Sequence, residues 1–336
     1  MPLSMPSRIR FQAIAEDQPG RKWQALCEQA WPYYRAWFLR QGAVARAGFL
    51  ECRRALRQHM PELVPTWERL VELAGGGDIE ARFLSLWCPP PYITGCSQAV
   101  WLDAVGQQEP MLLRNYDFAP ALLEGHWLAT RWSGQRVAAM GDCLWGALDG
   151  MNESGLAASL SFGGRTAHGD GFGIPLVLRY VLEIAQDTAS AVAILQRVPV
   201  HMCYSVTLLD ARGEWATVFL NPDRPVEVTR RRAVTNFQHT VEWPEHARAT
   251  SACERLAALQ QQIDAGTPAR DAQAALLREP LYQPAWRRGY GTLYTAAYAP
   301  GAGRIELSWP GQTWLQSLHA FEEGQREIAY PGQRPP

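Results

Sequence analysis

Residues 92–101 read YITGCSQAVW, and this stretch predicts how the chain runs on both sides of it. Three prolines at positions 89–91 come directly before it and exclude a regular helix or a central strand at that point. The chain therefore arrives in an extended form, passes the small residue Gly95, presents the thiol of Cys96 and enters an apolar run with strand character. Cys96 is the first candidate for a functional residue.

A second predicted strand, residues 110–118, ends in a polar cluster that contains Arg114 and Asp117. The short connection between the two strands favours antiparallel pairing. We therefore expect the ends of these neighbouring strands to bring Cys96, Arg114 and Asp117 together.

The part of the chain before the prolines has apolar residues at helical spacing. This pattern predicts helices over residues 20–41, 43–59, 65–73 and 78–86. Pro32 predicts a kink or a break in the first of them. The segment before Cys96 is therefore expected to be mainly helical, apart from a short strand at residues 9–15.

After Cys96 the pattern changes to short strands separated by turn residues, with helices in two clusters. Strands are predicted at residues 98–105, 110–118, 127–132, 136–143, 145–152, 156–161, 204–210, 215–221, 225–230, 292–299 and 303–309. Helices are predicted at residues 174–186, 189–197, 247–265 and 271–277. The tail from residue 324 onward is expected to be frayed. Helices clustered between runs of antiparallel strands are typical of a layered α+β fold.

Composition excludes several classes of function. The chain has 336 residues, enough for one large domain or two, and a formal net charge of −1, which favours neither nucleic acid nor a membrane surface as a partner. No apolar run reaches the ~20 residues of a membrane-spanning helix, and the N-terminus lacks the apolar core of a secretory signal.

Seven cysteines without paired spacing favour a reducing compartment, so we expect a cytoplasmic protein without a metal site. An oligomer is compatible with this composition.

Three motifs, GCS at residues 95–97, RNYD at 114–117 and GMNESGLA at 150–157, occur in an order and spacing that resemble a known family. The family is that of the acyl-CoA:6-aminopenicillanic acid (isopenicillin-N) acyltransferases, which is related to choloylglycine hydrolase and penicillin V acylase. Its members are N-terminal-nucleophile (Ntn) amidohydrolases and acyltransferases. The resemblance covers roughly residues 78–316.

The resemblance implies a four-layer αββα sandwich at residues 96–336. Residues 1–95 would then form a helical propeptide or small-subunit segment. It also implies that Cys96 is the nucleophile and that the Gly95–Cys96 bond is cut by self-processing. The free α-amino group would then act as the base, because the pKa of such an amine, near 7.7–8.0, is close to working pH. The thiol, with a pKa near 8.5, is mostly protonated at neutral pH and needs a base. No cofactor is implied.

The resemblance assigns roles to three further side chains. Asp117 would orient the amino group of Cys96, and Arg114 would fix that carboxylate or engage the substrate. Asn236 would stabilise the oxyanion, for which a neutral, directional amide is well suited. Bile-salt-hydrolase relatives have an Asn near position 161 as a second donor, whereas this chain has Ser161, so a hydroxyl or a backbone N–H would have to take that place.

The substrate implied by the resemblance is a small molecule with a linear amide bond or an acyl-CoA thioester. We favour hydrolysis over transfer, because a transferase must exclude water. Two alternatives remain open. The first is an unprocessed Cys–His hydrolase that uses His239, although in the family the His directly follows the Asn, and here two residues separate it from Asn236. The second is a non-catalytic binding protein that retains the fold, in which Cys96 is a buried small hydrophobe.

Overall fold

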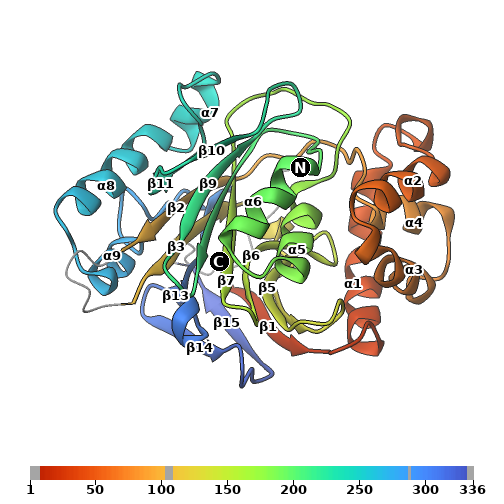
Figure 1. The fold of residues 1–336 in the computed structure, drawn as a ribbon, viewed down its shortest axis with the longest axis horizontal. Helices are drawn as coiled ribbons and strands as arrows, with labels where there is room; N and C mark the ends of the chain where they lie inside the picture. The colour runs from red at the N-terminus through yellow and green to blue at the C-terminus, as the bar shows by residue number, and fades with distance from the viewer. Residues whose placement is uncertain (1–7, 103–108, 287–288, 331–336) are drawn as a thin grey trace, which may run out of the picture.

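Two β-sheets lie face to face in the computed structural model, which describes residues 8–102, 109–286 and 289–330. Strands β2 and β3 of one sheet lie across from β7 and β8 of the other. Helices cover the outer face of each sheet, so the order of layers is helix, sheet, sheet, helix (Figure 1). The predicted α+β class and the αββα sandwich are confirmed.

The larger sheet has nine strands within the described residues, in the order β10-β9-β8-β7-β6-β5-β4-β1-β15. All neighbours are antiparallel except β1 and β4, which are parallel. Its strands are β1 (Arg8–Ala15), β4 (His126–Thr130), β5 (Val137–Asp142), β6 (Gly146–Asn152), β7 (Leu156–Phe162), β8 (Tyr204–Asp210), β9 (Trp215–Leu220), β10 (Glu227–Thr229) and β15 (Gly324–Ala329).

The smaller sheet has six strands in the described part of the chain, in the order β11-β2-β3-β12-β13-β14, and every pair is antiparallel. Its strands are β2 (Gly95–Trp101), β3 (Met111–Phe118), β11 (Ala233–Val234), β12 (Gly291–Ala299), β13 (Arg304–Trp309) and β14 (Gln312–Ser317). β2 and β3 are the two strands predicted around Cys96, although residues 103–105 of the first prediction lie outside the described residues.

Three helical groups flank the sheets (Figure 1). Helices α5 (Ile174–Ile184) and α6 (Thr188–Arg197) pack on the nine-stranded sheet. On the other side, α8 (Ala252–Asp264) packs on β2 and β11, with α7 (Pro244–Ala249) and α9 (Ala269–Ala275) beside it. The N-terminal helices, which pack beyond α5, are α1 (Arg21–Phe38), α2 (Phe49–His59), α3 (Val64–Leu73) and α4 (Asp78–Leu84). Among the described residues, no helix is both long and apolar enough to cross a bilayer.

Three apolar clusters hold the layers together. One joins the nine-stranded sheet to α5, α6 and the N-terminal helices, a second fills the space between the sheets, and a third lies between the smaller sheet and α8 and α9. Neighbouring residues of β8 show how alternation divides a strand between two clusters, because Leu208 faces the helices and Leu209 faces the second sheet. Each sheet is therefore buried on both faces over much of its area.

The segment before Cys96 also contributes a strand to the main fold. In β1, Ile9, Phe11 and Ala13 are buried in the cluster between the sheets. Gly125 makes the close approach of β1 and β4 sterically feasible, because it has φ +69° and a Cβ there would lie 2.5 Å from the Arg10 carbonyl oxygen. The domain boundary after residue 95 stays a prediction.

The prediction of a frayed C-terminal tail was wrong for its first part, and residues 331–336 lie outside the described residues. Residues Gly324–Ala329 form β15, which pairs with β1 at the edge of the larger sheet. The sequence there, GQREIA, has little apolar content, and only Ile328 is buried, so the pattern of the tail alone does not indicate a strand. The pairing depends on a partner more than 300 residues earlier in the chain.

Helix boundaries differ from the predictions at three places. The predicted helix over residues 43–59 is a short 3-10 turn at Ala43–Ala45 followed by α2, which begins at Phe49. α1 runs unbroken through Pro32, whose side chain is exposed. The predicted helix over residues 247–265 is divided into α7 and α8, because Ser251 adopts a left-handed conformation with φ +49°.

Truncating a leucine between the sheets tests the layer assignment. Leu209 is fully buried, so Leu209→Ala removes buried apolar atoms and leaves a cavity. We expect the free energy of unfolding, measured by urea denaturation, to fall by about 2–5 kcal/mol. The matched control is Leu315→Ala on β14, where the side chain is 59% exposed and a change within about 0.5 kcal/mol is expected. Equal losses for the two variants would contradict the assignment.

Candidate active site

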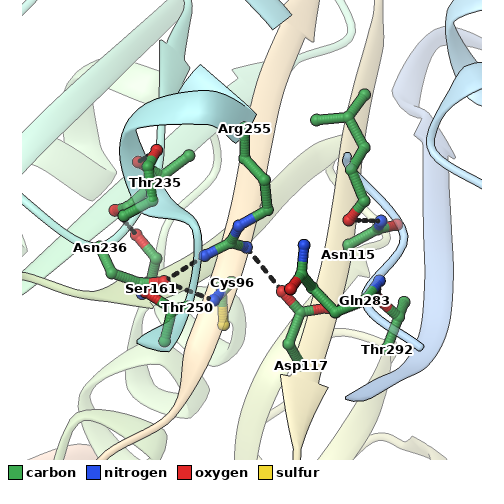
Figure 2. Close-up of polar contacts among 12 residues, drawn as sticks. Cys96, Asn115, Asp117, Ser161, Thr235, Asn236, Thr250, Arg255, Gln283 and Thr292 are labelled. Carbon is green, nitrogen blue, oxygen red and sulfur yellow. Dashed lines mark hydrogen bonds and ion pairs between the residues drawn. The ribbon is translucent and has the colours of Figure 1, made fainter. Parts of the chain in front are cut away.

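The pairing of β2 with β3 sets the positions of the predicted site residues. Gly95 lies opposite Asp117, and Cys96 lies opposite Tyr116. β11 runs antiparallel to β2 on its other side, with Val234 opposite Gln98. This register brings the segment just after β11 alongside Cys96, and that segment contains Asn236 (Figure 2).

The Cys96 sulfur is fully buried and has two polar neighbours. Arg114 Nη2–H donates a hydrogen bond to Sγ over 3.3 Å, and the Thr94 hydroxyl lies 3.8 Å from Sγ. Burial raises the pKa of the Cys96 thiol, and the positive charge of Arg114 opposes that rise. Arg114 is therefore positioned to stabilise a thiolate at Cys96.

A buried ion pair with Asp149 holds Arg114 in place, and the sequence pattern did not predict it. Arg114 forms an ion pair with Asp149 of β6 and donates to the Leu148 carbonyl over 2.6 Å. Asp149 also accepts hydrogen bonds from the hydroxyls of Tyr294 and Tyr298 on β12. Because Arg114 is anchored to the opposite sheet, its guanidinium is oriented before any substrate arrives.

The Asn236 side chain contacts the backbone on both sides of the Gly95–Cys96 junction. Its Oδ1 accepts a hydrogen bond from the Cys96 backbone N–H over 3.0 Å. Its Nδ2 donates weakly to the carbonyls of Thr94 and Phe162, at 3.5 and 3.3 Å. An amide donor therefore lies close to the nucleophile candidate, with only long hydrogen bonds.

Arg255 of α8 is a further residue of the candidate site that the sequence pattern did not predict. It is fully buried, its Nη1 donates to Asp117 Oδ2 over 2.6 Å, and its Nη2 donates to Asn236 Oδ1 over 2.7 Å (Figure 2). A signal was present in the sequence, because Arg255 lies at helical spacing between Ala252 and Leu259 on the buried face of α8. A charged residue on a buried face requires a partner of opposite charge.

Asp117 is the carboxylate of the buried cluster that Arg255 forms with Asp117 and Asn236. It is fully buried, and its Oδ1 accepts a hydrogen bond from the Thr292 hydroxyl over 2.6 Å. Burial raises the pKa of Asp117, and Arg255, Thr292 and Arg114 each act in the opposite direction by favouring the charged form. Asp117 is linked to Asn236 through Arg255, and its backbone is paired with that of Gly95.

Two other residues that the sequence suggested, Ser161 and His239, hydrogen-bond residues other than Cys96. Ser161 donates its hydroxyl to the Thr235 carbonyl over 3.2 Å, so it supports the segment that carries Asn236. His239 is about half exposed and hydrogen-bonds Glu227 over 2.8 Å. Within the described residues, the hydrogen-bond partners of the Cys96 sulfur include no histidine.

Gly95 cannot be replaced without a rearrangement. A Cβ at this position would lie 1.6 Å from the Tyr290 hydroxyl oxygen and 3.3 Å from Asp117 Cβ. A side chain at position 95 would therefore have to displace the Tyr290 hydroxyl from its place beside Gly95.

A cavity of about 310 Å³ lies next to the cluster. Tyr92 and Phe118, which flank the ends of β2 and β3, are among the residues that line it. The Phe118 ring packs against Tyr116 with 5.9 Å between ring centroids, and Tyr116 lies opposite Cys96.

In residues 8–102, 109–286 and 289–330, no group of three or more His, Cys, Asp or Glu side chains is arranged to hold a metal ion.

Comparison with protein families gives one match. The sequence model described as acyl-coenzyme A:6-aminopenicillanic acid acyl-transferase matches residues 105–314, which is more than half of the chain. The match contains Arg114, Asp117, Asn236 and Arg255, and it begins after Cys96. A comparison with curated protein sequences finds no match.

Solved structures similar to this chain include three with low sequence identity. Penicillin V acylase from Agrobacterium tumefaciens is 15% identical, over 67% of this chain and 86% of that chain, with a TM-score of 0.47. An N-acylethanolamine-hydrolyzing acid amidase ortholog from Caenorhabditis elegans is 14% identical, over 61% and 93%, with a TM-score of 0.46. A mutant of conjugated bile acid hydrolase from Clostridium perfringens is 13% identical, over 69% and 96%, with a TM-score of 0.39.

Removing the Arg255 side chain tests the buried ion pair. Arg255→Leu leaves the Asp117 carboxylate buried without its cation, and we expect the free energy of unfolding to fall by about 3–5 kcal/mol. Loss of the cation also moves the folded-state pKa of Asp117 further above its unfolded value. The variant then takes up a proton on folding, so its stability falls as the pH rises through that pKa.

Urea denaturation at pH 5 and pH 8 measures both effects, and the loss is expected to be larger at pH 8. The control is Arg248→Leu on α7, an exposed arginine paired with Glu245, for which a loss of at most ~1 kcal/mol is expected. A loss for Arg255→Leu that matches the control, or that does not change with pH, would contradict the role of the pair.

Proposed function

The chain belongs to the acyl-coenzyme A:6-aminopenicillanic acid acyl-transferase family, and from this premise we propose that it is a cysteine Ntn enzyme that breaks linear amide bonds. One observation carries the proposal. The Cys96 sulfur is hydrogen-bonded to Arg114 and the Cys96 nitrogen to Asn236, in one buried cluster that Arg255 joins to Asp117.

Maturation is the first step of the proposal. In the continuous chain the Cys96 nitrogen is a peptide nitrogen and cannot act as a base. Sγ attacks the Gly95 carbonyl carbon, the Gly95–Cys96 C–N bond breaks, and the nitrogen takes up a proton. Water then hydrolyses the resulting thioester, which leaves a carboxylate on Gly95 and a free amine on Cys96. Because residue 95 is glycine, no Cβ stands next to this carbonyl.

Cleavage also gives the substrate access to the nucleophile. Cys96 is fully buried, and Thr94 and Gly95 lie against it. Movement of the new chain end away from Cys96 exposes Sγ and its amine. That movement also removes the Thr94 carbonyl from Asn236 Nδ2 and frees one amide N–H.

Amide cleavage then proceeds through an acyl-cysteine. The α-amine takes the proton of the Cys96 thiol, whose thiolate is stabilised by Arg114. Sγ attacks the substrate carbonyl, and Asn236 Nδ2–H donates to the oxyanion. The protonated amine of Cys96 delivers its proton to the leaving amine, and water hydrolyses the acyl-cysteine.

Asp117 and Arg255 serve as positioning residues in this scheme. Arg255 holds Asn236 Oδ1, so Nδ2 must point the other way, toward the oxyanion. It also holds Asp117, whose backbone pairs with Gly95, the residue directly before the new amine. The buried ion pair therefore orients the oxyanion donor and the base together.

We favour hydrolysis of a small-molecule amide over transfer from acyl-CoA, because the displacement of Thr94 and Gly95 that admits the substrate to Cys96 also admits water. His239 gives little support to a Cys–His mechanism, because it is exposed and bound to Glu227. All seven cysteines, which lie in the described residues, are unpaired, and this supports the proposal of a reducing compartment such as the cytoplasm.

Intact-mass measurement of purified protein tests the maturation step. We expect two chains, residues 1–95 and 96–336, from the wild type, because Sγ of Cys96 attacks the bond before it. The variant Cys96→Ala lacks the sulfur and is expected to remain one chain without amidase activity. Cys253→Ala is the control, because this cysteine is exposed on α8 and is expected to leave both cleavage and activity unchanged. Full-length wild type with amidase activity would contradict the α-amine mechanism.

A further inference from the structure

The cavity beside the site opens between α1 and the segment around residues 121–124. Tyr33 and Leu122, two of the residues that line it, are 79% and 58% exposed, so the entrance of the cavity is apolar. Deeper in the cavity, the lining contains the carboxyl groups of Glu124 and Asp142. The opening therefore leads from an apolar rim to an acidic interior.

The two carboxyl groups lack a full cationic partner. Both hydrogen-bond the Tyr34 hydroxyl, and Glu124 also accepts from the Leu144 backbone N–H over 2.9 Å. Among the described residues that line the cavity there is no Lys or Arg. Burial and the neighbouring Glu124 raise the pKa of Asp142 to about 7, because two buried carboxylates repel each other.

His126 supplies a second, independent sign of a missing partner. Its side chain is 7% exposed, and within the described residues its Nδ1 has no hydrogen-bond partner. The nearest carboxylate oxygen, Glu124 Oε2, lies 3.7 Å from Nδ1, too far for a hydrogen bond. Burial raises the pKa values of the other titratable groups beside the carboxyls, Tyr34, Tyr92 and Cys143, so these groups stay protonated and neutral. A phenol or a thiol is not a cation in either form, so the counter-charge does not come from them.

Aromatic rings form the walls between the rim and the carboxyl groups. Tyr34 and Trp37 are arranged edge to face with centroids 6.2 Å apart, and Trp37 and Tyr92 likewise at 6.0 Å. Ring faces attract cations, and carboxylates attract them more strongly. Aromatic walls with acidic groups at their base are complementary to an ammonium group on an apolar stem, and not to an anion.

We propose that this cavity binds a protonated amine carried on an apolar or aromatic stem, with the ammonium group between Glu124 and Asp142. Such a ligand would supply the counter-charge that the two carboxyl groups lack. Its stem would lie among Tyr34, Trp37 and Tyr92. The positive charge of the ammonium group would also offset the repulsion between the two carboxylates, so both would remain ionised in the complex.

The cavity lies close enough to Cys96 to belong to its substrate. Phe118 in the lining follows Asp117 in β3 and packs on Tyr116, the residue opposite Cys96. Tyr92 in the lining is four residues before Cys96 in the chain. The ligand is therefore assigned as the cationic part of an amide substrate, and this last assignment rests on the proposed function.

Calorimetric titration of the full protein at pH 8 tests the inference. The probes are 2-phenylethylamine and 2-phenylethanol, which share a stem and differ in charge. The amine is expected to bind at least about tenfold more tightly than the alcohol, because only the amine can form charge-assisted hydrogen bonds. The titration is repeated with Cys96→Ala, so the result does not depend on turnover, and the same preference is expected there.

Three variants locate the effect. Glu124→Gln keeps the acceptor oxygen for Tyr34 and Leu144, and Asp142→Asn keeps one for Tyr34; each is expected to weaken amine binding at least about fivefold and to leave alcohol binding unchanged. Glu28→Gln, an exposed α1 carboxylate outside the cavity lining, is the matched control and is expected to change neither.

Equal affinity of the wild type for amine and alcohol would overturn the inference, and so would a control variant that weakens amine binding as much as Glu124→Gln. Selective amine binding in a protein that cleaves no amide would support the cavity and count against the proposed function. Amide cleavage without amine selectivity would support the proposed function and overturn the inference about the cavity.

Discussion

The site depends on the two hydrogen bonds that the buried Arg255 guanidinium donates, one to Asp117 and one to Asn236. A buried guanidinium costs several kcal/mol unless its N–H groups meet acceptors, and here one acceptor comes from β3 and the other from the segment after β11. Because the guanidinium is planar, it fixes the distance and angle between the two acceptors. α8 thus does more than cover the smaller sheet, since it also fixes the oxyanion donor candidate relative to Cys96.

A second buried arginine ties the same cluster to the other sheet. Arg114 extends from β3 to Asp149 on β6 and contacts the Cys96 sulfur on the way. The two arginines therefore hold the cluster from opposite sides, one from the helical layer and one from the facing sheet. The αββα sandwich suits such a site, because a charged side chain buried between two layers can pair with an opposite charge on the neighbouring layer. The sulfur consequently lies in a desolvated environment, where it is hydrogen-bonded to the positively charged guanidinium of Arg114.

The sequence predicted those parts of the fold and site that follow from local pattern. Strand ends placed Cys96, Arg114 and Asp117 near one another because the two strands are adjacent in the chain and pair directly. Arg255 could not be placed in the same way, since it is 138 residues from Asp117 and comes from a helix whose docking is a tertiary event. β15 was missed for a similar reason, because its partner β1 is more than 300 residues away in the chain and its own composition is polar.

The most direct test of Cys96 as the nucleophile is to trap the acyl-enzyme. Purified protein is mixed with an activated phenylacetyl amide, quenched in acid within the first turnover and digested for mass spectrometry. The expected result is a phenylacetyl group on the peptide that begins with Cys96, on sulfur, and its release by hydroxylamine. An acyl group on any other residue, or turnover with no acylated peptide and an intact Gly95–Cys96 bond, would contradict the mechanism.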